Sequence, residues 1–168
     1  IMGEISDVEY LDYKYSDIQI NSGSFKNQIF DGHLKIKDDN LHLTYEGFID
    51  LRADKHIKFT IDVNKADLEN MHLTPRNCLL LANAEFDFHG NNFNNLDGIV
   101  KFNELQIETQ GEVLEVDRLT LKIDRAPDAD LFSLKSNVIN ANIYGKLNFD
   151  HLQDDFNYQL SRIFPALF

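Results

Sequence analysis

Apolar and polar residues alternate over most of this chain, and this alternation defines the strands that we predict. In residues 30–36 the even positions are apolar or glycine, and the odd positions are charged or histidine. The same spacing of two continues through 41–51 and 57–63. Residues two apart share a face of a strand. The pattern therefore predicts an antiparallel meander with one apolar face and one solvated face.

The second half of the chain continues this pattern. Gly111 predicts a hairpin, and the apolar face switches between Val138 and Ile139, which suggests a bulge. The further alternating segments are 84–88, 96–102, 105–107, 119–123 and 139–149.

Glycine recurs on the apolar side of the alternation, between large apolar residues. Gly32, Gly47, Gly98 and Gly145 each stand at the centre of such a step, and Gly90 stands in an imperfect one. A glycine inside a strand weakens it and marks a bend or a close approach of another group. We therefore interpret Gly32, Gly47, Gly98 and Gly145 as curvature glycines of a sheet that bends around its apolar side.

The predicted fold is mainly β, a curved, taco-like or partly tubular antiparallel sheet with an apolar concave face. A closed core, in a β-sandwich or in a sheet covered by a helix, would produce the same alternation, so both interpretations stay open. In the open form the face would be a groove for lipid. Its predicted lining residues are Phe30, Leu34, Ile36, Leu43, Tyr45, Ile49, Phe59, Ile61, Phe86, Phe88, Val100, Phe102, Ile143, Leu147 and Phe149.

Two segments depart from the alternation. Residues 66–75, which end near Pro75, predict a short helical connection or a crossing loop. Residues 151–168 carry apolar side chains at spacings of three and four, which predicts a C-terminal amphipathic helix. We expect residues 1–150 to form the sheet, and the helix to pack on or beside it and to plug or flank one open end.

Composition limits the partners. The 168 residues suit one domain. Their formal charge of -12 argues against nucleic acid and against an anionic membrane surface as the main partner. The single cysteine, Cys78, forms no internal disulfide and is expected to be a small buried residue. No signal peptide or membrane span is recognised, and from the start Ile1-Met2-Gly3 we expect that the chain is a piece of a longer protein.

Catalytic motifs are scarce, and the residues predict no enzyme, cofactor or metal. Asp87 and His89 share a strand face, where they suit either a proton-transfer pair or, as we favour, a solvated ion pair. Asp124, Asp128 and Asp130 offer oxygen ligands for Ca²⁺, but no glycine turn or distal glutamate completes a known site. We interpret them as a plain acidic loop.

The order of several segments resembles the TamB and AsmA-like family, in the form found in Bacteroidota. The matching segments cover nearly the whole chain and are 29–36, 41–51, 63–73, 98–105, 114–121 and 141–149, followed by the predicted helix that ends on Phe164-Pro165-Ala166-Leu167.

The resemblance implies a long periplasmic protein, anchored in the inner membrane, whose tubular or taco-shaped sheet carries phospholipid or another acyl-chain lipid toward the outer membrane. This chain would be an interior, non-catalytic segment without the anchor, flanked by neighbouring repeats of the same longer chain. An alternative is a scaffold for outer-membrane protein assembly, which would contact a TamA-like factor through its sheet edges. A third class is an enzyme or carbohydrate-binding β-domain.

Overall fold

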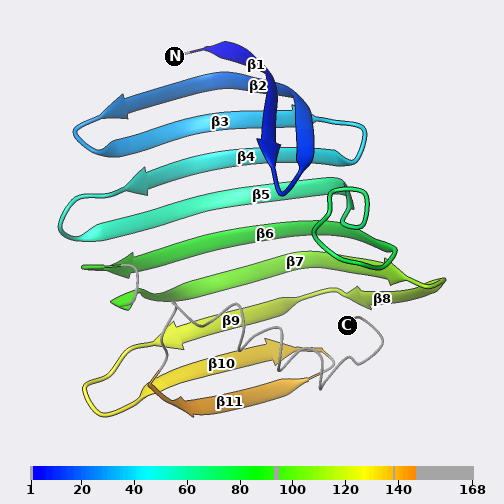
Figure 1. Ribbon diagram of the computed structural model, residues 1–168. Helices are drawn as coiled ribbons and strands as arrows, with labels where there is room; N and C mark the ends of the chain where they lie inside the picture. The colour runs from blue at the N-terminus through cyan, green and yellow to red at the C-terminus, as the bar shows by residue number, and fades with distance from the viewer. Residues whose placement is uncertain (1, 93–94, 138, 147–168) are drawn as a thin grey trace.

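The structure is a computed structural model that describes residues 2–92, 95–137 and 139–146. These residues form one open antiparallel sheet of eleven strands (Figure 1). The strands are β1 (Gly3–Tyr10), β2 (Tyr13–Lys26), β3 (Ile29–Lys37), β4 (Leu41–Asp50), β5 (Lys55–Asp67), β6 (Cys78–Gly90), β7 (Asp97–Thr109), β8 (Glu112–Val116), β9 (Leu119–Asp124), β10 (Asp130–Ser136) and β11 (Asn140–Gly145).

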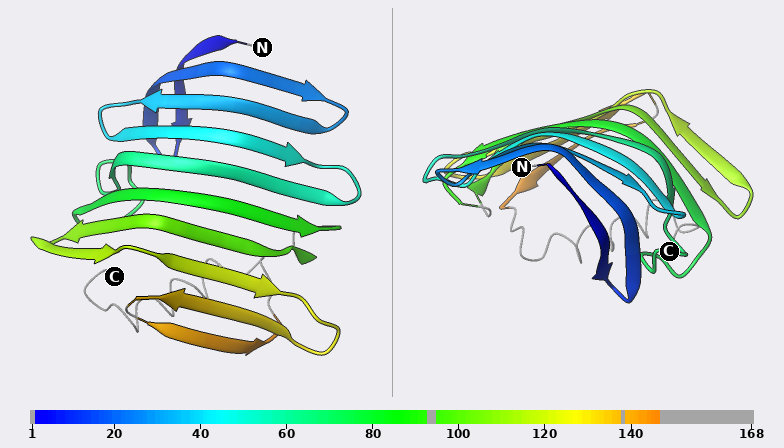
Figure 2. Two further views of the ribbon diagram at one scale, coloured as in Figure 1. Left: turned by 180° about the vertical axis from the view of Figure 1, so that it is seen from behind. Right: turned by 90° about the horizontal axis from the view of Figure 1, so that it is seen from above.

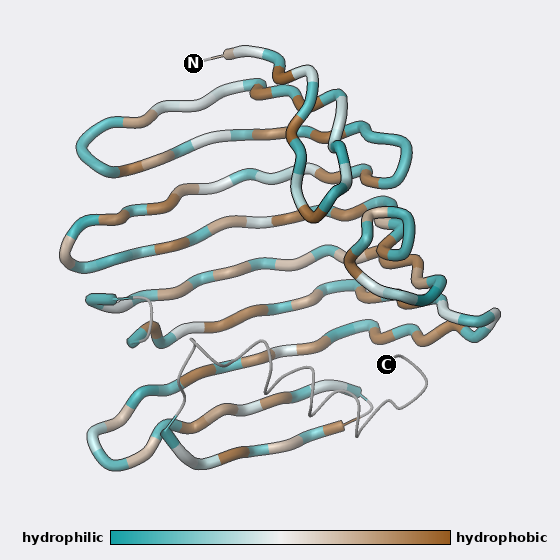
Figure 3. The backbone as a smooth tube through the Cα atoms, in the orientation of Figure 1, coloured by the Kyte–Doolittle hydropathy of each residue, from teal (hydrophilic) through white to brown (hydrophobic). Residues whose placement is uncertain are grey.

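The strands follow one another across the sheet in chain order. From β1 to β7, each strand pairs with the next one in the sequence. β7 is long enough for two partners, so that β8 pairs with residues 105–109 and β9 with residues 98–102. Hydrophilic residues occupy most of the turns, and hydrophobic residues alternate with them along the strands (Figure 3). The predicted antiparallel, mainly β architecture is therefore confirmed.

Cross-strand pairing defines which residues share a side of the sheet. Phe59 pairs with Gly47 on one side and with Phe86 on the other, and Phe86 pairs in turn with Val100. We call such a row of cross-strand partners a rung, and two further rungs contain Leu34 and Phe30. Every predicted lining residue that the structure describes stands on the same side, which we call the trough side, and the charged residues between them stand on the polar side.

The sheet is bent as an arch when it is seen from above (Figure 2). Four pairings contain a register shift in which one strand has an extra residue. The extra residue is Asn21 in β2, Asn64 in β5 against β4, and Asn103 in β7, and against β6 the two residues Asn64 and Lys65 of β5 face one. A bulge of this kind bends its strand and increases the local twist. The register shifts therefore lie at asparagines, which the sequence pattern did not single out.

Of the two alternatives for residues 66–75, the structure has the crossing loop and no helix. β5 continues through Asp67, and residues 68–77 form a loop of turns. The amide of Met71 donates to the carbonyl of Asp67 at 3.0 Å, and that of Leu73 donates to Leu68 at 2.8 Å. These bonds close single turns of different size, so no regular helix propagates. The spacing of Leu68 and Met71 resembles a helix because both side chains must reach the sheet.

The most compact part of the core lies under this loop. Its buried residues are Leu41, Val63, Ala66, Met71 and Ala82. Partly buried trough-side residues, among them Leu43 and Ile61, pack around them. The loop thus covers one end of the trough side. Cys78 is buried near the start of β6, as predicted.

The β1–β2 hairpin turns out of the main plane at the edge of the sheet (Figure 2). Asp17 has φ of +49° within β2, and its kink changes which residues of the strand face the trough side. Tyr13 and Tyr15 consequently pack against the core beside the loop. The imidazole Nδ1 of His72 lies 3.2 Å from the carbonyl oxygen of Leu11 and ties the hairpin to the loop.

Two predictions concern the C-terminal part. β10 ends at Ser136 and β11 begins at Asn140, so the predicted bulge at the face switch is a hairpin turn, with the amide of Ser136 donating to Ile139 at 2.9 Å. Leu147, Phe149 and the predicted helix at 151–168 lie outside the described residues. Within the described part of the chain, no helix is long and apolar enough to cross a membrane.

Candidate functional site

The centre of the trough side is aromatic. The rings of Phe59 and Phe86 stack with centroids 4.3 Å apart and planes inclined by 15°. Tyr45 adds a third ring, 5.3 Å from Phe59. All three side chains are only partly buried, because one layer of sheet covers them from behind. The arrangement is an apolar surface suited to contact with a flexible apolar ligand.

Tyr45 also contributes a polar atom to this surface. Its hydroxyl oxygen is buried and has no hydrogen-bond partner among the described residues. Burial raises the pKa of Tyr45, and the negative charge of Asp31 adds to the effect. A buried hydroxyl without a partner costs free energy.

Gly47 and Gly98 lie where neighbouring strands approach closely. A methyl group added at Gly47 would lie 2.5 Å from Phe59 Cβ and would also meet the carbonyl of Lys58. At Gly98 it would lie 2.6 Å from Phe88 Cδ1 and would meet the carbonyl of Asp87. The backbone φ values are +155° and +158°, in a region that residues with side chains rarely adopt.

Aromatic rings occupy the space that these glycines leave. The Cζ atom of Phe30 lies over Gly32, 2.8 Å from the position that a methyl group would take. Gly32 also pairs with Gly23 and Gly47, so that three glycines form a row across β2, β3 and β4. Aromatic side chains commonly protect strand glycines in this way. Gly145 differs, because a methyl group there would meet nothing within 4 Å.

The loop end of the trough side is closed by a polar network around the buried carboxylate of Asp38. The hydroxyl of Tyr13 donates to Asp38, and so does the Ser16 hydroxyl at 2.7 Å. The amides of Ser16 and Asn40 donate as well, at 3.0 and 2.9 Å. Burial opposes the charged form, but these hydrogen bonds outweigh it and lower the pKa of Asp38. The network holds the β1–β2 hairpin on the turn between β3 and β4.

The other end differs. At the turn after β4, Asp50 is held by the guanidinium and amide of Arg52, and these hydrogen bonds lower the pKa of Asp50 to about 2.

Ile143 of the edge strand β11 is 53% exposed, the most exposed of the described lining residues. The described part of the trough side is therefore most open toward this edge.

The polar side carries the hollows. One, of about 550 Å³, is lined by side chains that include Glu46, Lys58 and Glu85. A second, of about 570 Å³, lies at the strand ends beside His56 and His89. These hollows are lined by charges of both signs. Phe48 and Ile99 add apolar side chains to the first hollow.

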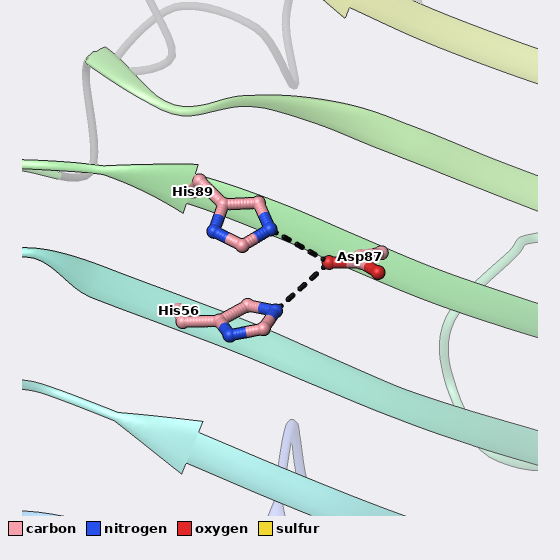
Figure 4. Close-up of side chains that lie close together, drawn as sticks. All are labelled: His56, Asp87 and His89. Atoms are coloured by element: carbon pink, nitrogen blue, oxygen red, sulfur yellow. Dashed lines mark hydrogen bonds and ion pairs between the residues drawn. The ribbon is translucent and has the colours of Figure 1, made fainter.

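A histidine and aspartate cluster lies between these two hollows (Figure 4). Nε2 of His56 and of His89 lie 2.9 and 3.1 Å from the same oxygen, Oδ1 of Asp87. Lys58 contacts the other oxygen at 3.0 Å. Burial opposes the charged form of Asp87, but the hydrogen bonds from Lys58 and His56 leave its pKa lowered.

Only two members of this cluster, Asp87 and His89, were predicted to lie together from the sequence. His56 was missed because it stands on another strand. The signal was present, since pairing Ile57 with Phe88 in register also pairs His56 with His89.

The acidic loop between β9 and β10 uses its carboxylates internally. Asp130 accepts from Arg125 Nη1 at 2.7 Å, and both side chains are largely buried. Asp124 pairs with Lys122 at 2.7 Å. Asp128 belongs to no metal-ligand cluster among the described residues. The loop thus has the features of the plain acidic loop rather than those of a Ca²⁺ site.

Comparison with known proteins adds no assignment. No family model matches the chain, and no curated protein or solved structure matches it at a significant level.

Proposed function

We propose that this chain shields the acyl chains of phospholipid, or of a similar lipid, on its trough side. The observation that carries the proposal is the register, which brings apolar side chains from successive strands to one side of a bent sheet. The resemblance to the TamB and AsmA-like family supports the same function. On this proposal the chain is a non-catalytic, periplasmic segment of a longer envelope protein.

The position of the loop supports a concave trough side. Met71 of the loop packs against Leu41, Val63 and Ala82, which stand on that side. The loop and the β1–β2 hairpin both lie on the inner side of the arch (Figure 2). The apolar side chains therefore line the inside of the bend, where a flexible chain contacts several strands at once.

The size of the surface is adequate for an acyl chain. Strands lie about 4.8 Å apart, so a rung from β3 to β7 extends over roughly 19 Å. Burying one methylene contributes about 0.8 kcal/mol. About ten fully buried methylenes would contribute roughly 8 kcal/mol before the entropic cost of association is subtracted.

Neighbouring positions 58 and 59 provide a matched test, because Lys58 and Phe59 belong to opposite sides of β5. We would place the photo-crosslinking residue p-benzoylphenylalanine at each position and incubate the purified protein with phosphatidylethanolamine vesicles. We expect lipid adducts at position 59 and few at position 58, and phospholipid in an organic extract of the protein. Equal crosslinking at both positions, or an extract without lipid, would refute the proposal.

A second candidate function is a scaffold that binds strands of outer-membrane proteins or a TamA-like assembly factor. The supporting observation is β1, an edge strand in which every residue is exposed. An exposed edge is a template for adding a strand. Replacing Ile5 by proline should abolish strand addition at this edge while lipid crosslinking at position 59 persists. Strand addition that is unaffected by Ile5→Pro would exclude the edge.

A further inference from the structure

We propose that His56, Asp87 and His89 bind one divalent transition-metal ion of the zinc class. The cluster lies on the polar side of β5 and β6, behind the lipid-binding surface. It is therefore independent of the proposed function.

The three ligand atoms are nearly in place. Within the described residues this is the only group of three or more potential ligand side chains whose atoms lie together, all within 4.8 Å of one another. A tetrahedral centre with bonds of 2.0–2.1 Å separates its ligand atoms by about 3.3 Å. The observed separations from Asp87 Oδ1 to the two Nε2 atoms are 2.9 and 3.1 Å. Small side-chain rotations would admit an ion in place of the hydrogen-bonding protons.

The surrounding structure restricts the ligands to this arrangement. The two imidazole rings stack with centroids 3.8 Å apart, because His56 and His89 are cross-strand partners. Phe48 packs edge-on against His56 at 4.7 Å, so the rotation that turns both Nε2 atoms toward one ion falls mainly on the more exposed ring of His89. Lys58 holds Oδ2 of Asp87, so that Oδ1 faces the imidazoles. Partners of this kind orient metal ligands in proteins.

The donor set selects the class of ion. Two imidazole nitrogens and one carboxylate oxygen suit Zn²⁺ and its neighbours, whereas Ca²⁺ and Mg²⁺ take oxygen ligands. The ammonium of Lys58 opposes a further positive charge, and the excess of acidic residues over the whole chain favours it. Three protein ligands leave a fourth position for water or for a side chain of a partner. The bound ion would join β5 to β6 near their ends at the β4–β5 turn.

The test is calorimetric titration of chelator-treated protein with Zn²⁺, and with Ca²⁺ as a comparison. We expect one Zn²⁺ per chain and no comparable binding of Ca²⁺. His56→Ala, His89→Ala and Asp87→Asn should each weaken Zn²⁺ binding by about tenfold or more. His42→Ala removes an exposed histidine from the same side and should leave binding unchanged.

A rival explanation is non-specific attraction of cations to an acidic protein. It predicts similar binding of Ca²⁺ and Zn²⁺, and no difference between His42→Ala and the cluster variants. Either result would overturn the proposal. Circular dichroism of each variant separates loss of ligands from loss of fold, and Asp87→Asn preserves the shape of the side chain if an alanine variant fails to fold. Imidazole ¹⁵N shifts assigned to His56 and His89 upon Zn²⁺ addition would identify the ligands directly.

Discussion

Replacing Gly47 or Gly98 by alanine tests whether close strand approach requires glycine at these positions. At Gly47 the new methyl group would stand 2.5 Å from Phe59 Cβ, whereas ordinary contact begins near 3.4 Å. The neighbouring strand would have to retreat by roughly 0.9 Å, and overpacking of this kind costs about 1–3 kcal/mol. The positive φ adds about 1–3 kcal/mol of backbone strain.

The alanine substitution also has a favourable effect, because it restricts the unfolded chain. That gain is about 0.4–1 kcal/mol where the native backbone accepts alanine. The net expectation for Gly47→Ala and Gly98→Ala is a loss of about 1–5 kcal/mol in the free energy of unfolding. Gly145→Ala is the matched control, since its methyl group meets nothing within 4 Å. We expect that variant to be neutral or stabilised by up to about 1 kcal/mol.

Urea unfolding followed by far-ultraviolet circular dichroism measures these differences, with the slope m showing whether the unfolding transition stays comparable. A loss of 1 kcal/mol corresponds to a fall of about 2–4 °C in Tm for a chain of this size. If Gly47→Ala and Gly98→Ala are as stable as Gly145→Ala, the close-approach argument is wrong. If all three variants lose stability equally, glycine has a role in this sheet that local geometry does not explain.

Three further predictions concern the loop, the carboxylate of Asp38 and the carboxylate of Asp50. Met71→Ala should lower the free energy of unfolding by about 2–5 kcal/mol, measured by urea unfolding, because a buried side chain leaves a cavity in the core; an unchanged midpoint would show that the loop does not stabilise the sheet. Asp38→Asn should cost about 1.5–3 kcal/mol through lost hydrogen bonds to a charged group, and proteolysis within the β1–β2 hairpin should increase; hairpin protection equal to wild type would contradict this role. The lowered pKa values of Asp38 and Asp50 predict that their contribution to stability is complete above the ordinary value of 3.8 and is lost as the pH falls toward about 2, the pKa of Asp50. Acid unfolding of the Asp38→Asn and Asp50→Asn variants that is identical to that of the wild type would contradict the assignment.

The strands from β3 to β7 were predictable because one face of each is apolar and the other is charged. A slip of one residue would turn Phe59 and Ile61 toward solvent, so the alternation specifies register as well as strand content. The register also relates neighbouring strands. Continued to the ends of β5 and β6, it pairs His56 with His89. The local spacing of Asp87 and His89 was visible in the sequence, whereas the third ligand is separated from them by a turn and most of two strands.

The β1–β2 hairpin and the loop at 68–77 were not predictable from the alternation of apolar and polar residues. At Asp17 the backbone enters a positive φ, and the side on which the apolar residues stand changes within one strand. A search for strict alternation therefore finds no continuous strand over β2. In the loop, Leu68 and Met71 satisfy a helical spacing although their contacts are to the sheet. Tertiary packing, rather than local propensity, decides the structure of both segments.

The bend of the sheet was predicted from glycines. In the structure, asparagines stand at the register shifts, and glycines stand where strands approach closely. Asn21, Asn64 and Asn103 stand at the register shifts, where an extra residue bends a strand. Gly47 and Gly98 stand where a neighbouring backbone approaches too closely for a side chain. An inserted asparagine places two polar residues in a row, after which the apolar residues resume at positions of the opposite parity. Phase shifts at asparagine, read together with glycines on the apolar side, are therefore the sequence feature that relates this alternation to a curved sheet rather than to a flat one.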